Sequence, residues 1–371
     1  MNILEIFTTI VQIDSESGNE EKISVFIQNF LAQRNIEFSQ EKEFQIIAKI
    51  PAKNKNISEI KKLMFCAHMD TVSPGKNIEI IIDKNGKITS SGNTILGADN
   101  KASLANMLLL IDKISKNEIE NHHQLEFVFT TKEEIDEPAV YKLNIESLQS
   151  ELGFIFDKAN EENINTVVSV ASSISDFTVE LKGKGAHAST PERAINALEM
   201  LISFVSELKL GNCYPNSTLN IGVINGGEAT NTVPSVIHLA GDFRSESPEY
   251  MKKIEEDLRR AQMKVLSAKK FKDANIDINI IIYCKGYTHN VNSPAFKNLE
   301  KIYSQLGYDG IKVLKTQSGS DASCFMNHRL NVIETFCLND GCFEVHTVKE
   351  WTTIENLEKL QEIMQKIVKY W

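Results

Sequence analysis

The chain alternates short apolar runs with amphipathic helical segments, and this alternation is the strongest constraint on its fold. The expected strands are residues 44–51, 61–68, 123–131, 151–156 and 330–338, with a hairpin over residues 78–91. The expected helices are residues 3–13, 19–35, 100–116 and 353–371. Strands that alternate with helices form parallel sheets covered on both faces. The pattern therefore predicts an α/β domain with a mainly parallel sheet.

Residues 172–286 depart from this alternation of single strands and helices. Their expected order is strand 175–185, helix 193–208, strands 217–226 and 235–245, helix 248–266 and strand 275–283. Such a β-α-β-β-α-β order is the ferredoxin-like arrangement. Because the α/β pattern resumes afterwards, we expect one domain made of residues 1–171 and 287–371, with an inserted ferredoxin-like α+β domain over residues 172–286.

The composition is that of a globular protein with an acidic balance. The 371 residues are 42% hydrophobic and carry a formal net charge of −10, with a pI of about 5.4. Nucleic-acid binding needs a clustered basic surface, so this charge argues against it. The N-terminal segment lacks the features of a signal peptide, and the apolar runs are far shorter than the roughly 20 residues that span a bilayer. Six scattered cysteines indicate reduced thiols, so we expect a cytoplasmic protein without a membrane partner.

Side chains that can bind a metal ion follow four of the expected strands. They are His68, the pair Glu133 and Glu134, Asp157 and His346. Asp99 adds a further carboxylate at the entrance to the helix over residues 100–116. Ligands of open α/β sheets bind outside the carboxyl ends of the strands, so we expect these side chains to meet at one edge.

The types of these side chains indicate a metal centre. Two histidines and three carboxylates supply the nitrogen and oxygen donors that suit zinc, cobalt or manganese. Five donors, one of which can bridge, fit two ions roughly 3.5–4 Å apart. Glu133 lies beside Glu134 and is not one of the five donors. It could take a proton from a metal-bound water, whose pKa the metal lowers to about 7. Asp70 should face the same way as His68 in an extended chain and accept its second ring N–H.

Taken singly, each of these residues has an ordinary interpretation. Glu133 and Glu134 could be a solvated loop, Asp157 a turn residue or helix N-cap, and His346 a surface histidine. The pair His122 and His123 reads as an exposed loop. No P-loop, GxGxxG or GxSxG motif competes with the metal site. The joint placement at strand ends favours the metal site.

Several motifs occur in an order that resembles a known family. "AHMDTVSPG", "TILGADNKASLA", "TKEEID", "FDKAN", "GKGAHAST", "NTVPS", "DFRS", "SGSDAS" and "EVHT" are similar to motifs of the dinuclear zinc exopeptidases. That family includes peptidase T, carboxypeptidase G, acetylornithine deacetylase and succinyl-diaminopimelate desuccinylase. The similarity covers essentially the whole chain. "HMDTVSPG" and "TILGADNKA" look most like the peptidase T branch, the tripeptide aminopeptidases.

The resemblance implies two metal ions, most simply zinc, that Asp99 bridges. His68 and Asp157 would complete one site, and Glu134 and His346 the other. Glu133 would be the general base, with Asp70 orienting His68. The bond between Asp99 and its successor would be cis, as in the family.

The resemblance also assigns the inserted domain and the substrate contacts. Residues 172–286 would be the lid and dimerisation domain, and the rest of the chain the catalytic domain. His187 would reach the active site of the partner subunit in a homodimer and stabilise the oxyanion. The remaining matches are to substrate-binding positions, with Arg244 pairing with a carboxylate: Asn231, Arg244, Gly319, Ser320 and Asp321.

The sequence thus predicts a peptidase T-like enzyme that hydrolyses short peptides by attack of a hydroxide bound to two metal ions. A dipeptidase, a carboxypeptidase or an N-acyl-amino-acid deacylase of the same family remains an alternative. A catalytically silent binding dimer on the same scaffold is an alternative of a different class. One departure concerns specificity, because "IDEPA" at residues 135–139 stands where relatives carry a nearby glycine.

Overall fold

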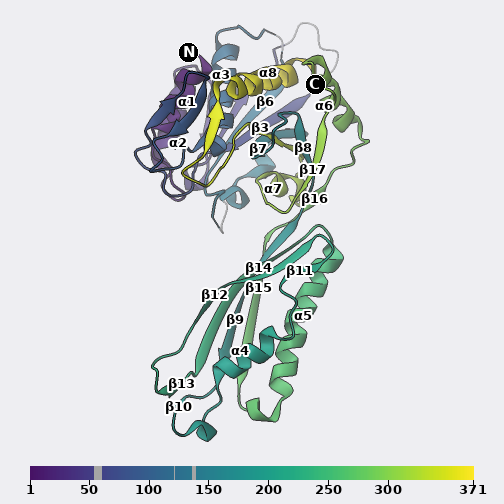
Figure 1. Cartoon of the computed structure of the whole chain (residues 1–371). Helices are drawn as coiled ribbons and strands as arrows, with labels where there is room; N and C mark the ends of the chain where they lie inside the picture. Colours follow the sequence, from purple (N-terminus) through teal and green to yellow (C-terminus); the bar gives the residue numbers. More distant parts are fainter. Residues whose placement is uncertain (54–60, 121, 136–138) are drawn as a thin grey trace. The chain divides into compact units, whose positions relative to one another are not determined.

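A computed structural model describes residues 1–53, 61–120, 122–135 and 139–371 of the chain. The described chain divides into two compact units (Figure 1). The first unit consists of Met1–Ser169, Thr288–Lys315 and Ser320–Trp371, and the second of Val170–Tyr287 and Thr316–Gly319. The short segment Thr316–Gly319 lies outside the insertion expected at residues 172–286.

The first unit is built on a mixed sheet. Its strands, in spatial order, are β1 (Glu37–Gln40), β2 (Ile46–Ile50), β6 (Gln124–Thr130), β3 (Lys62–His68), β7 (Leu152–Lys158), β18 (Glu334–Asn339), β8 (Thr166–Ala171) and β16 (Tyr287–Thr288), with β17 (Lys312–Thr316) beside β8. The four central strands β6, β3, β7 and β18 pair in parallel. Antiparallel pairs flank them, β1 with β2, β2 with β6, and β18 with β8. The expected parallel sheet is therefore confined to the centre.

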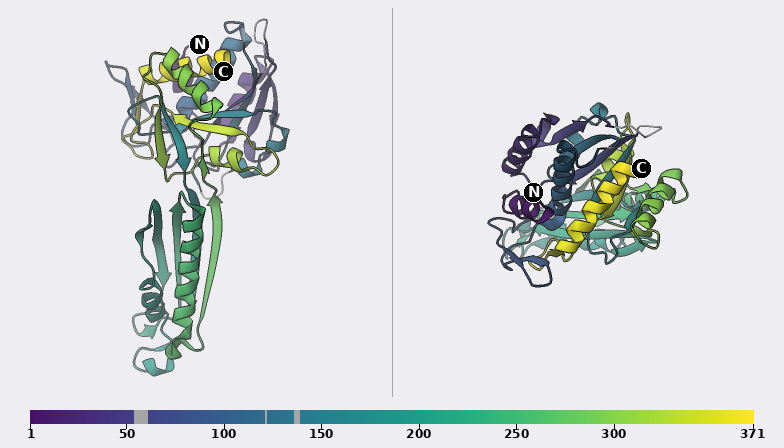
Figure 2. Two further views of the ribbon diagram at one scale, coloured as in Figure 1. Left: turned by 90° about the vertical axis from the view of Figure 1, so that its right-hand side faces the viewer. Right: turned by 90° about the horizontal axis from the view of Figure 1, so that it is seen from above.

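Helices cover the sheet. They are α1 (Ile3–Val11), α2 (Glu21–Ala32), α3 (Ala98–Ser115), α6 (Pro294–Gln305), α7 (Ala322–Asn327) and α8 (Ile354–Tyr370). Figure 2 shows α1, α3 and α8 side by side above the sheet, where α3 contacts both of the others. The peptide bond between Asp99 and Asn100 is cis, as the resemblance implies, and the backbone of both residues departs from helical geometry.

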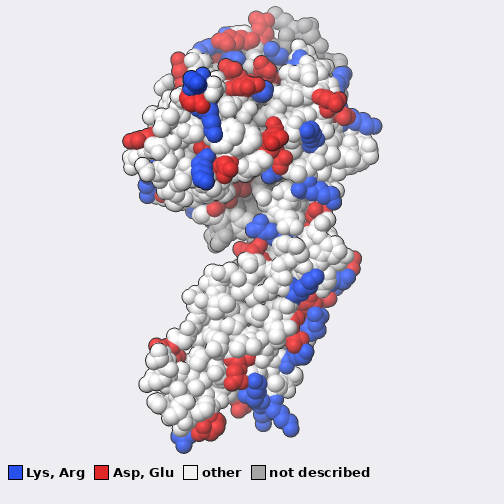
Figure 3. All heavy atoms as spheres, viewed as in Figure 1, with Lys and Arg blue, Asp and Glu red and all other residues white. Residues whose placement is uncertain are grey.

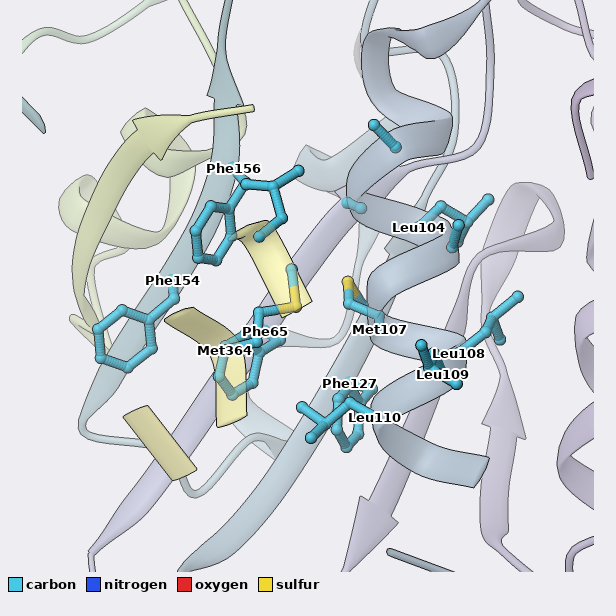
Figure 4. Close-up of a cluster of buried hydrophobic side chains, with 14 of the residues drawn as sticks. Phe65, Leu104, Met107, Leu108, Leu109, Leu110, Phe127, Phe154, Phe156 and Met364 are labelled. Atoms are coloured by element: carbon cyan, nitrogen blue, oxygen red, sulfur yellow. The ribbon is translucent and has the colours of Figure 1, made fainter. Parts of the chain in front are cut away.

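The core of the first unit lies between the central strands and α3. Phe65, Phe127 and Phe154 come from three neighbouring strands, and Met107 of the helix points toward the side on which these rings lie (Figure 4). The Phe65 ring centroid lies 5.8 Å from that of Phe127 and 5.5 Å from that of Phe154. Because α1 and α8 pack against α3 from other sides, nearly all of its side chains are buried. This apolar layer holds the parallel strands in register.

The second unit is a five-stranded antiparallel sheet with helices. The sheet order is β11 (Gly211–Tyr214), β12 (Ser217–Gly226), β14 (Val236–Ser245), β9 (Ser173–Lys182) and β15 (Asn275–Cys284). The helices α4 (Ala197–Val205) and α5 (Pro248–Ser267) pack on one face. Apart from the added strand β11, this is the ferredoxin-like order that the sequence predicts.

Smaller elements complete the two units. In the first, β4 (Ile80–Ile82), β5 (Lys87–Ser90) and β19 (Trp351–Thr353) form a three-stranded sheet. In the second, β10 (Ala186–His187) pairs with β13 (Thr232–Val233). On α5, basic and acidic side chains alternate (Figure 3), for example Lys253 Nζ at 2.6 Å from Glu249 Oε1. None of the described helices is long and apolar enough to cross a membrane.

The expectation that His122 and His123 lie in an exposed loop is wrong. Both are buried, with 1% and 2% of their surface exposed. The N–H of His122 donates to the carbonyl of Lys53, and that of His123 to the carbonyl of Val368 in α8. The Nδ1 of His123 accepts a hydrogen bond from the N–H of Lys61. The Nδ1 of His122 lies 2.8 Å from the carbonyl oxygen of His123, so one ring nitrogen of each imidazole has a backbone partner where the chain enters β6.

Candidate metal centre

Six of the predicted site residues meet at the carboxyl edge of the four parallel strands. His68 is the last residue of β3, Asp157 lies near the end of β7, and Asp99 stands at the start of α3. Glu133 and Glu134 follow the end of β6, and His346 lies in the loop after β18. These side chains lie at the same edge because all four strands run in one direction.

Asp99 stands between two sets of donor atoms. Its Oδ1 lies 3.3 Å from His68 Nε2, and its Oδ2 lies 3.5 Å from His346 Nε2. His68 Nε2 is also 3.4 Å from Asp157 Oδ1, and His346 Nε2 is 2.9 Å from Glu134 Oε1. In each set, the ligand atoms lie within 4.8 Å of one another. The two sets share only Asp99, which has one oxygen directed to each.

The electrostatics of this cluster suit cations. Burial would lower the pKa of His68, but bonds to Asp157, Asp70 and Asp99 raise it well above its usual value. Hydrogen bonds to Asp99 and Glu134 raise the pKa of His346 to about 10. The buried Oδ1 of Asp99 lacks an aligned hydrogen-bond donor among the described residues. Two histidines with raised pKa values beside several buried carboxylates, one of whose oxygens lacks an aligned donor, fit a site for divalent cations.

Glu133 lies beside both sets without belonging to either. One of its oxygens is within 4.8 Å of donor atoms of His68 and Glu134. Burial and the negative charge of Asp157 raise the pKa of the Glu133 carboxyl well above its usual value. A carboxyl group with a raised pKa can both take and return a proton near neutral pH. The position and the pKa fit the role of general base.

Asp70 does more than the sequence indicates. The Nδ1 of His68 lies 3.1 Å from the backbone carbonyl oxygen of Asp70 and 3.5 Å from its carboxylate oxygen Oδ1. The carboxylate instead accepts hydrogen bonds from the N–H groups of Glu133 and Glu134, at 3.1 and 3.2 Å, and from the hydroxyl of Ser17 at 2.7 Å. Asp70 therefore contacts the His68 ring through both its carbonyl oxygen and its carboxylate, and its carboxylate also holds the backbone of the glutamate pair.

The sequence did not indicate three other supports of the cluster. Glu20 accepts hydrogen bonds from the N–H groups of Gly18 and Lys132, the latter next to Glu133. Glu350 accepts from the N–H groups of Gly97 and Asp99. The side-chain amide of Asn100 donates to Asp157 Oδ1 at 2.5 Å. A glutamate in a polar stretch carries no sequence sign of burial, so in this region the sequence predicts the ligands Asp99 and Asp157 and the cis bond, but not the groups that support them.

The predicted substrate residues fall into both units. Ser320 and Asp321 belong to the first. Asp321 is buried, accepts a hydrogen bond from the Thr130 hydroxyl at 2.5 Å, and has its pKa raised by burial to about 7. Its carboxylate thus binds Thr130, the last residue of β6. Residues 136–138, most of the "IDEPA" departure, lie outside the described residues.

His187 and three of the predicted substrate residues, Asn231, Arg244 and Gly319, lie in the second unit. His187 and Asn231 are neighbours, because the N–H of Ala188 donates to the carbonyl of Asn231. The His187 Nδ1 lies 2.7 Å from the Ser189 hydroxyl. Arg244 donates from Nε to Asp242 and from Nη1 to the carbonyl of Gln317, two residues before Gly319.

Comparisons with known proteins agree with this architecture. Residues 171–269 match the M20 peptidase dimerisation domain, and residues 45–176 match peptidase family M28. A tripeptidase from Staphylococcus aureus superposes with a TM-score of 0.89 at 28% identity, covering 99% of this chain and 97% of that chain. Aminopeptidase PepT from Bacillus cereus superposes with a TM-score of 0.86 at 26% identity and the same coverage. The uncharacterised protein YqjE of Bacillus subtilis is 27% identical over 99% of this chain and 97% of its own length. These matches confirm the resemblance found in the sequence.

The raised pKa of His346 predicts how the stability of the chelator-treated protein depends on pH. The folded pKa of about 10 exceeds the ordinary value of 6.5. Protonated His346 therefore stabilises the fold fully below pH 6.5, and this contribution is lost as the pH rises through 10. The melting temperature of wild type should exceed that of His346→Gln at the acidic end, and the difference should shrink toward the alkaline end. His238→Gln, an exposed histidine of the second unit, is the control. A difference independent of pH would contradict this electrostatic account.

Proposed function

We propose that this chain, a metallopeptidase hydrolase of the M20/M28 type, is a tripeptide aminopeptidase that works with two bound zinc ions. The observation that carries the proposal is the placement of Asp99 between two donor sets. The names of two structural neighbours, a tripeptidase and an aminopeptidase, support the substrate class.

The donor set supports the metal assignment. His68, Asp99 and Asp157 would hold one ion, while Asp99, Glu134 and His346 would hold the other. Imidazole nitrogen with carboxylate oxygen is a zinc-like mixture, and cobalt or manganese can occupy the same donors. When bound, the two ions would polarise the scissile carbonyl and lower the pKa of a bound water toward 7.

Glu133 performs the proton transfers in this scheme. Its carboxylate takes a proton from the attacking water and then delivers it to the nitrogen of the leaving amine. The backbone bonds from Glu133 and Glu134 to Asp70 hold the carboxylate in place for both transfers. Glu20 holds the preceding residue, Lys132, from the other side of the loop.

The second unit supplies the groups proposed to contact the substrate. Asp242 and the carbonyl of Gln317 orient the Arg244 guanidinium, which can pair with a substrate carboxylate. Asn231 and Gly319 would contact the peptide from the same unit, and Ser320 from the first. Closure of this unit over the bound peptide would exclude water from the reaction.

His187 serves the partner's active site in this proposal. Arg244 pairs in register with Ile174 at the start of β9, whereas His187 follows the far end of that strand, beyond Lys182 (Figure 1). The nine residues from Ile174 to Lys182 make eight steps of about 3.3 Å, which span roughly 26 Å. A tripeptide that contacts Arg244 cannot also reach His187 of the same chain. This distance supports a homodimer in which His187 crosses to the partner.

The second unit also offers a surface for that dimer. On its outer side, β11 pairs with β12 only from Ser217 to Leu219, so the rest of the β12 edge extends past it. Val223 and Ile224 of that edge, with Leu198 and Ile202 of α4, are exposed apolar side chains. An exposed apolar strand edge is a site for pairing with another chain.

We place the enzyme in the cytoplasm. All six cysteines are free thiols and all are buried: Cys66, Cys213, Cys284, Cys324, Cys337 and Cys342. Unpaired cysteines in such number are typical of a reducing compartment.

A substrate panel tests the proposed activity. Zinc-, cobalt- or manganese-loaded protein should hydrolyse tripeptides with a free N-terminus faster than dipeptides, N-acetyl amino acids or N-blocked peptides. Preference for one of the other substrates would instead indicate a dipeptidase, carboxypeptidase or deacylase. Binding of two metal ions without hydrolysis of any panel member would favour a silent binding dimer.

Replacement of the general base should separate chemistry from metal binding. Glu133→Gln should lower kcat by about 10²–10⁴-fold while two metal ions stay bound, because Glu133 lies outside the two donor sets that share Asp99. Metal content is measured by elemental analysis, and Glu118→Gln, an exposed glutamate of the first unit, is the control. Full activity of Glu133→Gln would remove it from the mechanism.

Mixed dimers should show whether His187 acts across the interface. His187→Ala alone should lower kcat by about 10²-fold or more, the usual cost of losing an oxyanion donor. When Glu133→Gln and His187→Ala chains are co-refolded, one site of each mixed dimer combines an intact Glu133 with the partner's intact histidine. Activity should therefore reappear in the mixture. Continued inactivity of verified mixed dimers would contradict the crossing.

A further inference from the structure

We propose that Glu350 is a positioning residue that sets the bridging carboxylate of Asp99 between the two donor sets. The inference rests on the metal pair of the proposed function. Glu350 lies outside both donor sets and contacts Asp99 only through the main chain.

The contact is a two-pronged hydrogen bond from a buried carboxylate. Glu350 Oε2 accepts from the N–H of Gly97 at 2.7 Å, and Oε1 accepts from the N–H of Asp99 at 3.0 Å. Only 1% of the Glu350 surface is exposed, so water does not compete for these bonds. A carboxylate that accepts two N–H bonds in a buried place fixes the direction of both donors.

The backbone at Asp99 needs such an anchor. Gly97 has a φ of +70°, and Asp99 has a ψ of 106°, so neither residue has helical geometry although α3 begins here. The first N–H groups of a helix lack partners within the helix and must find them elsewhere. Glu350 supplies those partners from a segment 251 residues beyond Asp99. The direction of the Asp99 side chain therefore depends on a distant loop.

The same loop carries a metal ligand. His346 and Glu350 both lie between Phe343 and Trp351, whose backbones exchange hydrogen bonds of 2.9 Å in both directions. The two rings stack at a centroid distance of 4.3 Å and close the base of the loop. Glu350 thus connects the loop that carries His346 to the backbone of Asp99. This connection holds His346 Nε2 at 3.5 Å from Asp99 Oδ2.

The experiment compares Glu350→Gln and Glu350→Asp with Glu344→Gln. Glutamine has the size of glutamate, but its amide nitrogen faces an N–H group and cannot accept. Aspartate keeps both acceptors on a side chain too short to reach both donors. Glu344 is exposed in the same loop, so Glu344→Gln removes one charge there without touching the contact. Zinc affinity is measured by competition with a chromophoric chelator, and Co(II) absorption reports on the coordination geometry.

We expect Glu350→Gln to weaken zinc binding by about 10–100-fold, the usual cost of losing a group that supports a ligand. The Co(II) spectrum should change and kcat should fall with KM nearly constant, while the chelator-treated variant melts close to wild type. Glu344→Gln should match wild type throughout. If Glu350→Gln does not fold, Glu350→Asp is used in its place.

Three results would overturn the inference. The first is zinc affinity of folded Glu350→Gln within twofold of wild type, with an unchanged Co(II) spectrum. The second is failure of both Glu350 variants to fold, which would make the residue a determinant of the fold alone. The third is wild type that binds fewer than two ions, which would also refute the metal pair of the proposed function. Wild type with two ions and an unaffected variant would refute only the role of Glu350.

Discussion

The candidate site depends on the parallel pairing of β6, β3, β7 and β18 in adjacent positions. Parallel strands end at the same edge, so residues as distant in sequence as His68 and His346 come together there. The pairing in turn depends on the apolar layer in which Phe65, Phe127 and Phe154 pack against α3. A shift of one residue in one strand would turn its final side chain to the other face of the sheet.

Buried carboxylates around the cluster bind main-chain N–H groups. Asp70 holds the Glu133–Glu134 backbone, Glu20 holds Lys132, and Glu350 holds Gly97 and Asp99. A buried carboxylate is costly unless hydrogen bonds compensate for the lost water. Here the compensation comes from loops that would otherwise leave their N–H groups unpaired. Each carboxyl group therefore binds N–H groups of a loop beside the place proposed for the cations.

The sequence predicted the central part of this arrangement well, and its surroundings poorly. His68 and Asp157 could be predicted because several apolar runs end at a donor residue, and Asp99 because a further carboxylate stands at the entrance to a helix. Glu350 and Glu20 could not, because a carboxylate bound to backbone N–H groups looks in sequence like any surface charge. Asp321 was expected beside the substrate, yet its carboxylate is buried and bonded to Thr130. Whether such a carboxylate is buried, and which group it binds, depends on tertiary packing, which the periodicity of the sequence does not reveal.

The central claim is that Asp99 bridges two metal ions. Anomalous scattering at the zinc edge from crystals of the zinc-loaded protein tests it most directly. We expect two peaks per chain roughly 3.5–4 Å apart, one between His68 and Asp157 and one between Glu134 and His346, with one Asp99 oxygen on each. A single peak, or two peaks without Asp99 between them, would contradict the account.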